Sequence, residues 1–123
     1  MRLLNKINLD ICKGNEKPMF FVKQNDSGRE LEIEFYQNGE ILTIPDGDNI
    51  TLHVRRPDDS KFSSSGEHSY NKFMTSLTSE MLELPGALTC EVVVVDGEEP
   101  ETRITFPTFT IIVNPTNVER QTP

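Results

Sequence analysis

The chain has no tryptophan and only two cysteines and two histidines among its 123 residues. Cys12 and Cys90 lie far apart and have no CxxC spacing, so the sequence offers neither a redox pair nor a zinc site. The two thiols are able to form one disulfide or to lie apart as small buried hydrophobes. We favour the second interpretation, because an isolated cysteine ordinarily behaves as a small apolar side chain.

Long hydrophobic runs are also missing. The chain opens Met-Arg-Leu-Leu-Asn-Lys, which lacks the apolar segment of a signal peptide. Nowhere does it contain the roughly 18 consecutive apolar residues of a transmembrane helix. The sequence therefore predicts synthesis and folding in a cytoplasm, and it leaves open later assembly into a particle that leaves the cell.

Positive charge is scarce. The formal net charge is −8, and the longest basic cluster is the pair Arg55 and Arg56. An acidic surface repels phosphate backbones and anionic lipids, so we expect no nucleic-acid partner and no membrane partner. The ordinary consequence of such a charge is solubility.

Catalytic and cofactor-binding motifs are absent as well. His53 is expected on the polar side of a strand and His68 in a loop, and no GxSxG motif supplies a nucleophile for either. The acidic segment 46–49 lacks the length and the closing glutamate of an EF-hand, so we interpret it as a β-turn and not as a calcium site. The sequence predicts a protein that is not an enzyme, with no catalytic residue, no cofactor and no metal.

What the sequence does contain is alternation of apolar and polar residues. The clearest unit is residues 30–36, where three apolar residues face one way and three glutamates face the other. The dipeptide Asn38–Gly39 follows, which is typical of a two-residue hairpin turn with positive φ at both positions. The pairs expected to face each other across this turn are Phe35 with Leu42, and Ile33 with Ile44.

The three glutamates of this unit, Glu30, Glu32 and Glu34, are interpreted as a solvated outer face. Their charge is expected to discourage aggregation at a strand edge.

Further strands are indicated by similar patterns, with turn residues between them. Pro107 interrupts the last long strand, and because proline cannot donate to a strand ladder it marks an edge or a bulge. The serine-rich segment 63–66 is expected to be a mobile loop. Thr78 is a candidate N-cap for one helical turn over residues 78–82. The remaining expected strands are residues 6–11, 19–22, 50–55, 69–77, 87–95 and 103–113.

These patterns give about eight short strands and at most one short helical turn, and the strands do not alternate with long helices. That order excludes a parallel α/β sheet and predicts an all-β fold, a two-sheet antiparallel β-sandwich. We expect residues 1–123 to form one domain, with an ordered core over about 5–114 and a polar tail at 115–123.

The order of several segments along the chain resembles that of a known protein family. The segments that carry this resemblance are 6–11, 20–26, 31–35, 38–39, 50–58, 81–86, 88–96 and 108–113. In this order they resemble the N-terminal domain of the baseplate upper protein of siphophages that infect Gram-positive bacteria.

The resemblance implies a β-sandwich that anchors a larger protein to the phage tail tip. Such a domain docks on the distal tail protein, among other baseplate proteins, and belongs to the virion tail baseplate after synthesis in the bacterial host cytoplasm. Further parts of these proteins form trimers and carry receptor-binding proteins outward for host attachment, which implies a homo-oligomer in the full-length context. The family has no enzymatic motif to carry over.

Three residues are candidates for binding a partner: Phe20, Phe21 and Pro107. Adjacent residues on a strand point to opposite faces, so one of the two phenylalanines is expected outside the core. Pro107 is a candidate because it marks a strand edge.

Two other functions stay open at this stage. A carbohydrate-binding β-sandwich module would need exposed aromatic rings, and this interpretation gains if Tyr36 and Tyr70 share one exposed face. A small jelly-roll enzyme is disfavoured, because the two histidines have no metal-ligand spacing.

Overall fold

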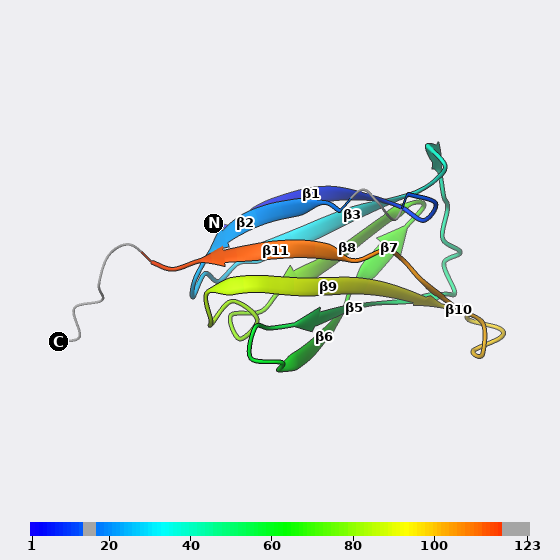
Figure 1. Cartoon of the computed structure of the whole chain (residues 1–123). Coiled ribbons are helices and arrows are strands. Elements are labelled where there is room, and N and C mark those ends of the chain that lie inside the picture. The colour runs from blue at the N-terminus through cyan, green and yellow to red at the C-terminus, as the bar shows by residue number, and fades with distance from the viewer. Residues whose placement is uncertain (14–16, 117–123) are drawn as a thin grey trace.

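The computed structural model describes residues 1–13 and 17–116, and its regular structure over these residues is entirely β. Eleven strands form two sheets that pack face to face (Figure 1). The described residues include no helix with the length and apolar character needed to cross a bilayer. The predicted β-sandwich is therefore confirmed. Of the expected polar tail, residues 117–123 lie outside the described part of the chain.

Sheet 1 has the strand order β1-β3-β8-β7, and a short strand, β4, also pairs with β3. β3 lies in the interior of this sheet, between β1 on one side and β8 with β4 on the other. Its strands are β1 (Leu3–Asp10), β3 (Arg29–Gln37), β4 (Glu40–Ile41), β7 (Glu67–Ser69) and β8 (Lys72–Leu77).

Sheet 2 has the strand order β2-β11-β9-β5-β6, and β10 also pairs with β9. The edge strands of the main path are therefore β2 and β6. Its strands are β2 (Met19–Lys23), β5 (Asn49–Arg55), β6 (Lys61–Ser65), β9 (Gly86–Val95), β10 (Arg103–Thr105) and β11 (Phe109–Asn114).

The sheets differ from the prediction in direction and in strand number. β1 pairs in parallel with β3, and β2 pairs in parallel with β11, so both sheets are mixed and not purely antiparallel. The parallel pairs arise because consecutive strands are placed in different sheets: β1 and β3 join sheet 1, whereas β2 between them joins sheet 2. Eleven strands replace about eight because several predicted runs are divided by turns and by a bulge.

The hydrophobic core lies between the two sheets and follows the predicted alternation. Leu31, Ile33 and Phe35 of β3 are fully buried. The Phe35 ring packs against that of Phe106, with ring centroids 4.7 Å apart and planes tilted by 41°. Both aromatic rings lie in the core, Phe35 from sheet 1 and Phe106 from the segment that leads into β11 of sheet 2, so they join the sheets directly.

The Asn38–Gly39 hairpin is confirmed, but only its first pair follows the predicted register. Asn38 and Gly39 have φ of 50° and 83°, and the Leu42 amide donates to the Phe35 carbonyl over 3.0 Å. Ile33 is paired with Phe73 of β8, so the prediction that it faces Ile44 is wrong. The Ile44 amide donates instead to the carbonyl of Tyr70, because β8 occupies this side of β3 beyond the turn.

The interpretation of the glutamate row is only half right. Glu30, Glu32 and Glu34 do face outward, but β3 is an interior strand, so they protect no edge. They are also largely covered: 28%, 12% and 26% of their side-chain surfaces are exposed. Each is paired with a cation from a neighbouring strand or from the N-terminal segment.

Pro107 lies at a β-bulge, as its missing amide predicted. β10 pairs with β9 in the register Thr105 to Val93, whereas β11 pairs with it one residue out of step, Phe109 to Cys90. The extra residue falls at Pro107 and Thr108, directly after the Phe106 amide donates to the Val92 carbonyl over 2.9 Å. The bulge turns the chain so that Phe106 and Phe109 both reach the core.

The serine-rich segment is a strand, so its prediction as a mobile loop is wrong. Residues 61–65 form β6 at the edge of sheet 2, and the chain then continues through Gly66 into β7 of sheet 1. The Ser64 and Thr75 hydroxyls lie 2.6 Å apart, and the Thr75 hydroxyl donates to the Ser65 carbonyl over 3.1 Å. Serine fits here because its small side chain lets β6 cross close over β8.

The segment expected to be one helical turn is a series of tight turns. The Met81 amide donates to the Thr78 carbonyl over 3.1 Å and to the Thr78 hydroxyl over 3.3 Å, so Thr78 does cap it. Met81 and Leu82 are buried in the core. This segment thereby closes one end of the sandwich without forming a helix.

The two cysteines are free and lie in different surroundings. Cys90 is buried in the core, and this burial raises its pKa to about 12. Cys12 is exposed, so the prediction of a small buried hydrophobe is right for Cys90 and wrong for Cys12.

The crossing at Gly66 yields a stability prediction. A Cβ built at Gly66 would lie 1.9 Å from the Met74 carbonyl oxygen, which is a backbone atom that cannot yield without moving β8. We expect Gly66→Ala to lower the free energy of unfolding in urea by about 2–3 kcal/mol.

Gly47→Ala is the matched control, because a Cβ at Gly47 meets nothing within 4 Å and its φ is not positive. It is expected to change the free energy of unfolding by less than about 0.5 kcal/mol. Equal stability of the two variants would contradict a close crossing at Gly66.

Candidate partner-binding face

The side chains considered for catalysis or metal binding do not come together. His53 is exposed on the outer face of sheet 2, whereas His68 lies in β7 of sheet 1 with its Nε2 2.9 Å from the Pro45 carbonyl oxygen. Within residues 1–13 and 17–116, no cluster of three or more histidine, cysteine or carboxylate side chains is arranged to hold a metal ion.

The acidic segment 46–49 is a turn that supports a neighbouring loop. The Asp48 amide donates to the Pro45 carbonyl over 3.0 Å, as in a β-turn. The Asp48 carboxylate accepts a hydrogen bond from the Gly97 amide over 3.1 Å. Asp48 therefore holds the loop between β9 and β10, which closes through a hydrogen bond from the Asp96 amide to the Thr102 carbonyl over 3.0 Å.

On the outer face of sheet 1, ion pairs link β3 to its neighbours. Arg2 pairs with Glu30 at 3.2 Å, Lys6 with Glu32 at 3.8 Å, and Lys72 with Glu34 at 3.9 Å. The Tyr36 hydroxyl also donates to Glu34 over 2.8 Å, and this hydrogen bond raises the Tyr36 pKa. The glutamates of β3 are therefore paired within the sheet, whereas Glu67 of β7 is exposed and has no ion pair among the described residues.

The outer face of sheet 2 begins at its edge with apolar side chains. Phe21 is 57% exposed and Met19 is 55% exposed on β2, whereas Phe20 points inward and packs partly against the core. Phe21 lies beside Ile112 of β11 in the register of the two strands. We call Met19, Phe21 and Ile112 the apolar strip. The expectation that one phenylalanine lies outside the core is confirmed, and that residue is Phe21.

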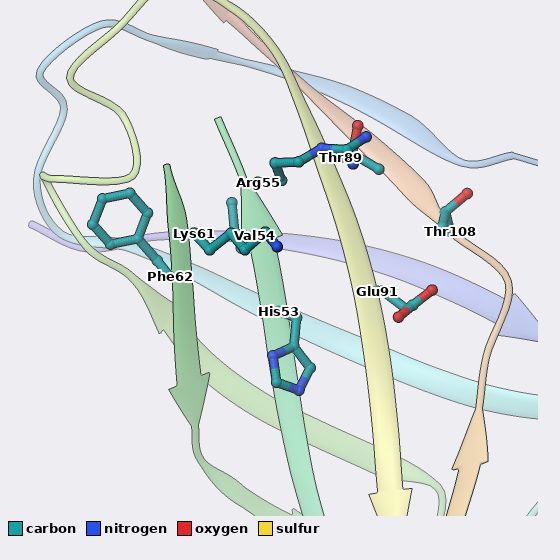
Figure 2. Close-up of a pocket in the computed structure, with 8 residues that line it drawn as sticks. All are labelled: His53, Val54, Arg55, Lys61, Phe62, Thr89, Glu91 and Thr108. Carbon is teal, nitrogen blue, oxygen red and sulfur yellow. The ribbon is translucent and has the colours of Figure 1, made fainter. Parts of the chain in front are cut away.

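Further across the same face lies a shallow hollow of about 210 Å³ (Figure 2). In Figure 2 the Arg55 side chain extends over β9 beside Thr89, and Glu91 and Thr108 lie on the far side of β9. The hollow is lined by His53, Val54, Arg55, Lys61, Phe62, Thr89, Glu91 and Thr108.

Pro107 belongs to the same sheet but not to the apolar strip. It is half-buried at the start of β11, next to Thr108 at the rim of the hollow, whereas Phe21 pairs near the other end of β11. The three residues proposed from the sequence are thus in one sheet without forming one cluster. Sequence reasoning missed Met19, although its position two residues before Phe21 places it on the same face.

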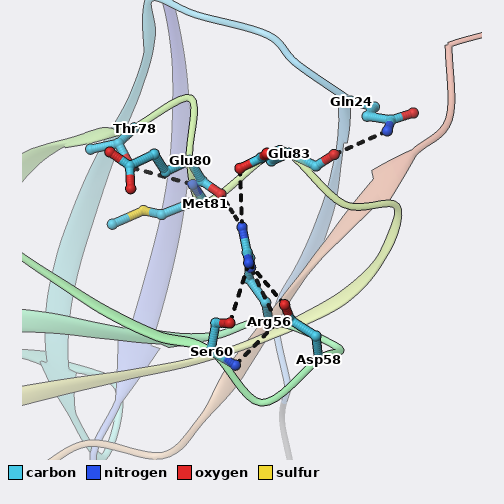
Figure 3. Close-up of polar contacts among 8 residues, drawn as sticks. All are labelled: Gln24, Arg56, Asp58, Ser60, Thr78, Glu80, Met81 and Glu83. Atoms are coloured by element: carbon cyan, nitrogen blue, oxygen red, sulfur yellow. Dashed lines mark hydrogen bonds and ion pairs between the residues drawn. The ribbon is translucent and has the colours of Figure 1, made fainter.

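Arg56 holds the end of the sandwich from which the β5–β6 hairpin projects (Figure 3). Its guanidinium donates to both oxygens of Asp58, over 3.2 and 2.8 Å, and to the Glu80 carbonyl over 2.9 Å. It also lies 3.4 Å from a Glu83 carboxylate oxygen, and its Cζ is 5.0 Å from the Phe62 ring centroid. Arg56 therefore ties the β5–β6 hairpin to the segment 78–85.

The same end is joined to β2 through its following loop. The Gln24 side-chain amide donates to the Glu83 carbonyl over 3.0 Å, and the Asn25 amide donates to the Leu82 carbonyl over 2.8 Å. The edge strand with the apolar strip and the hairpin with the hollow are thus attached to one common segment, which fixes their relative position.

An exposed tyrosine on sheet 1 is a second feature of interest. Tyr70 forms the turn between β7 and β8, is 57% exposed and has a φ of 61°, which is strained for a residue with a side chain. It lines a groove of about 510 Å³ together with Glu67, Lys72 and Met74. Tyr36 lies at the same end of sheet 1 but lines a different hollow, with Asp10 and Lys13.

Comparison with known proteins establishes the fold. No protein-family model matches the chain, and no curated protein matches it in sequence. Among solved structures it is similar to the N-terminal domain of phage TP901-1 ORF48, with a TM-score of 0.65 and 15% identity. The match covers 90% of this chain and 98% of that domain. This chain has that fold. The resemblance to a baseplate upper protein domain is thereby confirmed at the level of structure.

The Arg56 contacts predict a specific pH dependence. Hydrogen bonds from Arg56 and from the Ser60 amide hold the Asp58 pKa at about 2, below its ordinary value of 3.8. A carboxyl whose pKa is lower when folded contributes stability that is complete above the unfolded pKa and is lost as the pH falls through the folded one. We therefore expect Arg56→Met to destabilise the protein most near neutral pH, and the difference to shrink between pH 3.8 and about 2.

Urea unfolding at about pH 6 and about pH 2.5 measures this difference. The control is Arg103→Met, which removes an exposed arginine that forms no ion pair among the described residues and is expected to have little effect at either pH. A loss of stability in Arg56→Met that stays the same at both values would contradict the assigned role of the Asp58 pair.

Proposed function

We propose that this domain is a structural component of a phage or prophage tail baseplate, an adaptor that docks on the distal tail protein and links it to receptor-binding parts. The observation that carries the proposal is the apolar strip, in which Met19 and Phe21 are exposed beside the half-buried Ile112, on a domain with the fold of a phage protein domain. Exposed apolar side chains gathered at one sheet edge are typical of surfaces that a protein partner covers.

The fold supports a role in a virion, and the binding partner follows from the resemblance. We propose contacts with the distal tail protein and with other baseplate proteins, and a homo-oligomer in the full-length context. The location is the virion tail baseplate after synthesis in the host cytoplasm. We propose a non-enzymatic role, which is supported by the neighbour in fold, a phage structural domain.

The proposal predicts that this chain forms a stable complex with the distal tail protein. Mixed with the distal tail protein of the same phage, this chain is expected to co-elute in gel filtration, with a mass from light scattering that gives the copy number. Phe21→Ala is expected to weaken the complex at least about tenfold in calorimetry, because a half-exposed aromatic ring at an interface is a typical anchor.

Phe21→Ala should leave the free energy of unfolding of the isolated chain within about 0.5 kcal/mol, since the ring is not in the core. Phe20→Ala is expected to lower stability more, because Phe20 packs against the core. The matched control is Ile41→Ala, which removes an apolar side chain 50% exposed on sheet 1. Unchanged affinity in both phenylalanine variants would remove the apolar strip from the proposal, and separate elution of the wild-type proteins would refute the docking itself.

A second function, a carbohydrate-binding β-sandwich module, is favoured by one observation. Tyr70 presents an exposed ring at a strained backbone position over a groove that also holds the charged groups of Glu67 and Lys72. Exposed aromatic rings of this kind stack on sugar rings. Tyr36 does not strengthen the argument, because it is half-buried and its hydroxyl is engaged by Glu34.

A glycan-binding screen with purified host cell-wall polysaccharide separates the two functions. Carbohydrate binding requires a saturable signal that Tyr70→Ala reduces at least about tenfold and Tyr36→Phe leaves unchanged. For the adaptor that we propose, we expect no saturable signal in the wild type. A signal that Tyr70→Ala abolishes would establish the second function.

A further inference from the structure

The outer face of sheet 2 carries cations in excess, although the whole chain has a formal net charge of −8. By strand alternation, the side chains of this face are those of β2, β5, β6, β9, β10 and β11 that point away from the core. Among these outward-facing strand residues, Glu91 of β9 supplies the carboxylate. Its cations are Lys23, Arg55, Lys61 and Arg103, and all four are exposed.

None of these cations forms an ion pair with another of the described residues. The ion pairs of the described residues involve Arg2, Lys6, Arg29, Arg56 and Lys72, and none of the four cations of sheet 2. The contrast with sheet 1 is direct, because there each outward-facing glutamate of β3 has its own cationic partner.

Arg55 and Lys61 add a second, local observation. They lie directly opposite each other on the antiparallel strands β5 and β6, with their side chains on the outer face. Like charges in this position repel and destabilise the strand pair. Both residues line the hollow of about 210 Å³, together with the hydroxyls of Thr89 and Thr108 and the carboxylate of Glu91. An anion placed there would meet two cations and two hydroxyl donors against one carboxylate.

We infer that the outer face of sheet 2 binds an acidic protein surface, with carboxylates of the partner placed between Arg55 and Lys61 and apolar side chains of the partner covering Met19 and Phe21. This inference rests on the proposed docking function and specifies the chemistry of the partner. The four cations without an ion pair and the apolar strip lie on one face, whereas the glutamates of β3 on the opposite face have cationic partners.

A protein fits this face better than a nucleic acid does. The apolar strip on β2 would remain exposed against a phosphate backbone, which offers it no apolar contact. In addition, the net charge of −8 repels an extended polyanion at long range, while a partner with a local acidic patch meets chiefly the cationic face.

The test compares two double variants that remove the same charge from opposite faces. Arg55→Gln with Lys61→Gln removes the cross-strand pair of sheet 2, and Arg2→Gln with Lys6→Gln removes two exposed cations of sheet 1. Association with the distal tail protein is measured by stopped-flow or surface plasmon resonance over a series of salt concentrations, because complementary charges act mainly on the association rate.

We expect the sheet 2 double variant to associate about tenfold more slowly than the wild type at low salt and to depend less on salt. The sheet 1 variant should keep wild-type association and wild-type salt dependence. Thermal unfolding of the free sheet 2 variant is expected at or above the wild-type temperature, since the change removes a repulsion. This measurement shows whether slower association comes from the lost electrostatic attraction or from a loss of folded protein.

The outcomes distinguish this inference from the proposed function. Wild-type protein that forms no complex refutes the docking function. A complex whose association rate is equally affected, or unaffected, by the two double variants leaves docking intact and overturns the acidic-partner inference. Tighter binding of a mixed-sequence DNA duplex than of the distal tail protein in the same buffer would overturn it in favour of a nucleic acid.

Discussion

The close crossing of β6 over β8 at Gly66 is the constraint on which the rest of the structure depends. One continuous segment passes there from the edge of sheet 2 into the edge of sheet 1, and a Cβ at Gly66 would lie 1.9 Å from the Met74 carbonyl oxygen. The sandwich is thereby closed on one side by covalent continuity. The opposite edges are β1 in sheet 1 and β2 in sheet 2, and each of these strands is paired only within its own sheet.

The edge strand β2 carries an exposed apolar surface. Edge strands are usually protected against association by charge or proline. β2 has Lys23 at its end, but Met19 and Phe21 occupy the rest of its outer face and are more than half exposed. Such a surface costs solubility unless a partner covers it. The Arg56 contacts and the Gln24 to Glu83 hydrogen bond position β2 relative to the β5–β6 hairpin, so a partner meets the apolar strip and the cations as one prepared surface.

Much of the fold could be predicted from the sequence because its signals are local. The alternation in β3 and the Asn38–Gly39 turn fix which side chains enter the core, and Pro107 marks the bulge through its missing amide. The pairing partners could not be predicted, since parallel pairing of β1 with β3 depends on where β2 is placed in space. The serine segment 61–65 has weak β propensity of its own, and it is a strand because it pairs along its length with β5. The spacing of Cys12 and Cys90 along the chain does not reveal which of the two thiols is buried, so the sequence could not show that Cys12 is exposed.

The candidate site was harder to predict than the fold, for a physical reason. The adjacency of Phe20 and Phe21 indicated that one ring would lie outside, because neighbouring residues on a strand alternate in direction. The cationic face had no such local signal: Lys23, Arg55, Lys61 and Arg103 come from four strands and are brought together only by the strand order of sheet 2. The acidic total charge conceals them, because it sums 20 acidic and 12 basic residues over the whole chain and does not record on which face each one lies. Net charge therefore describes long-range repulsion well and contact chemistry poorly. The inferred acidic partner is selected by the outer face of sheet 2, whose cations form no ion pair among the described residues.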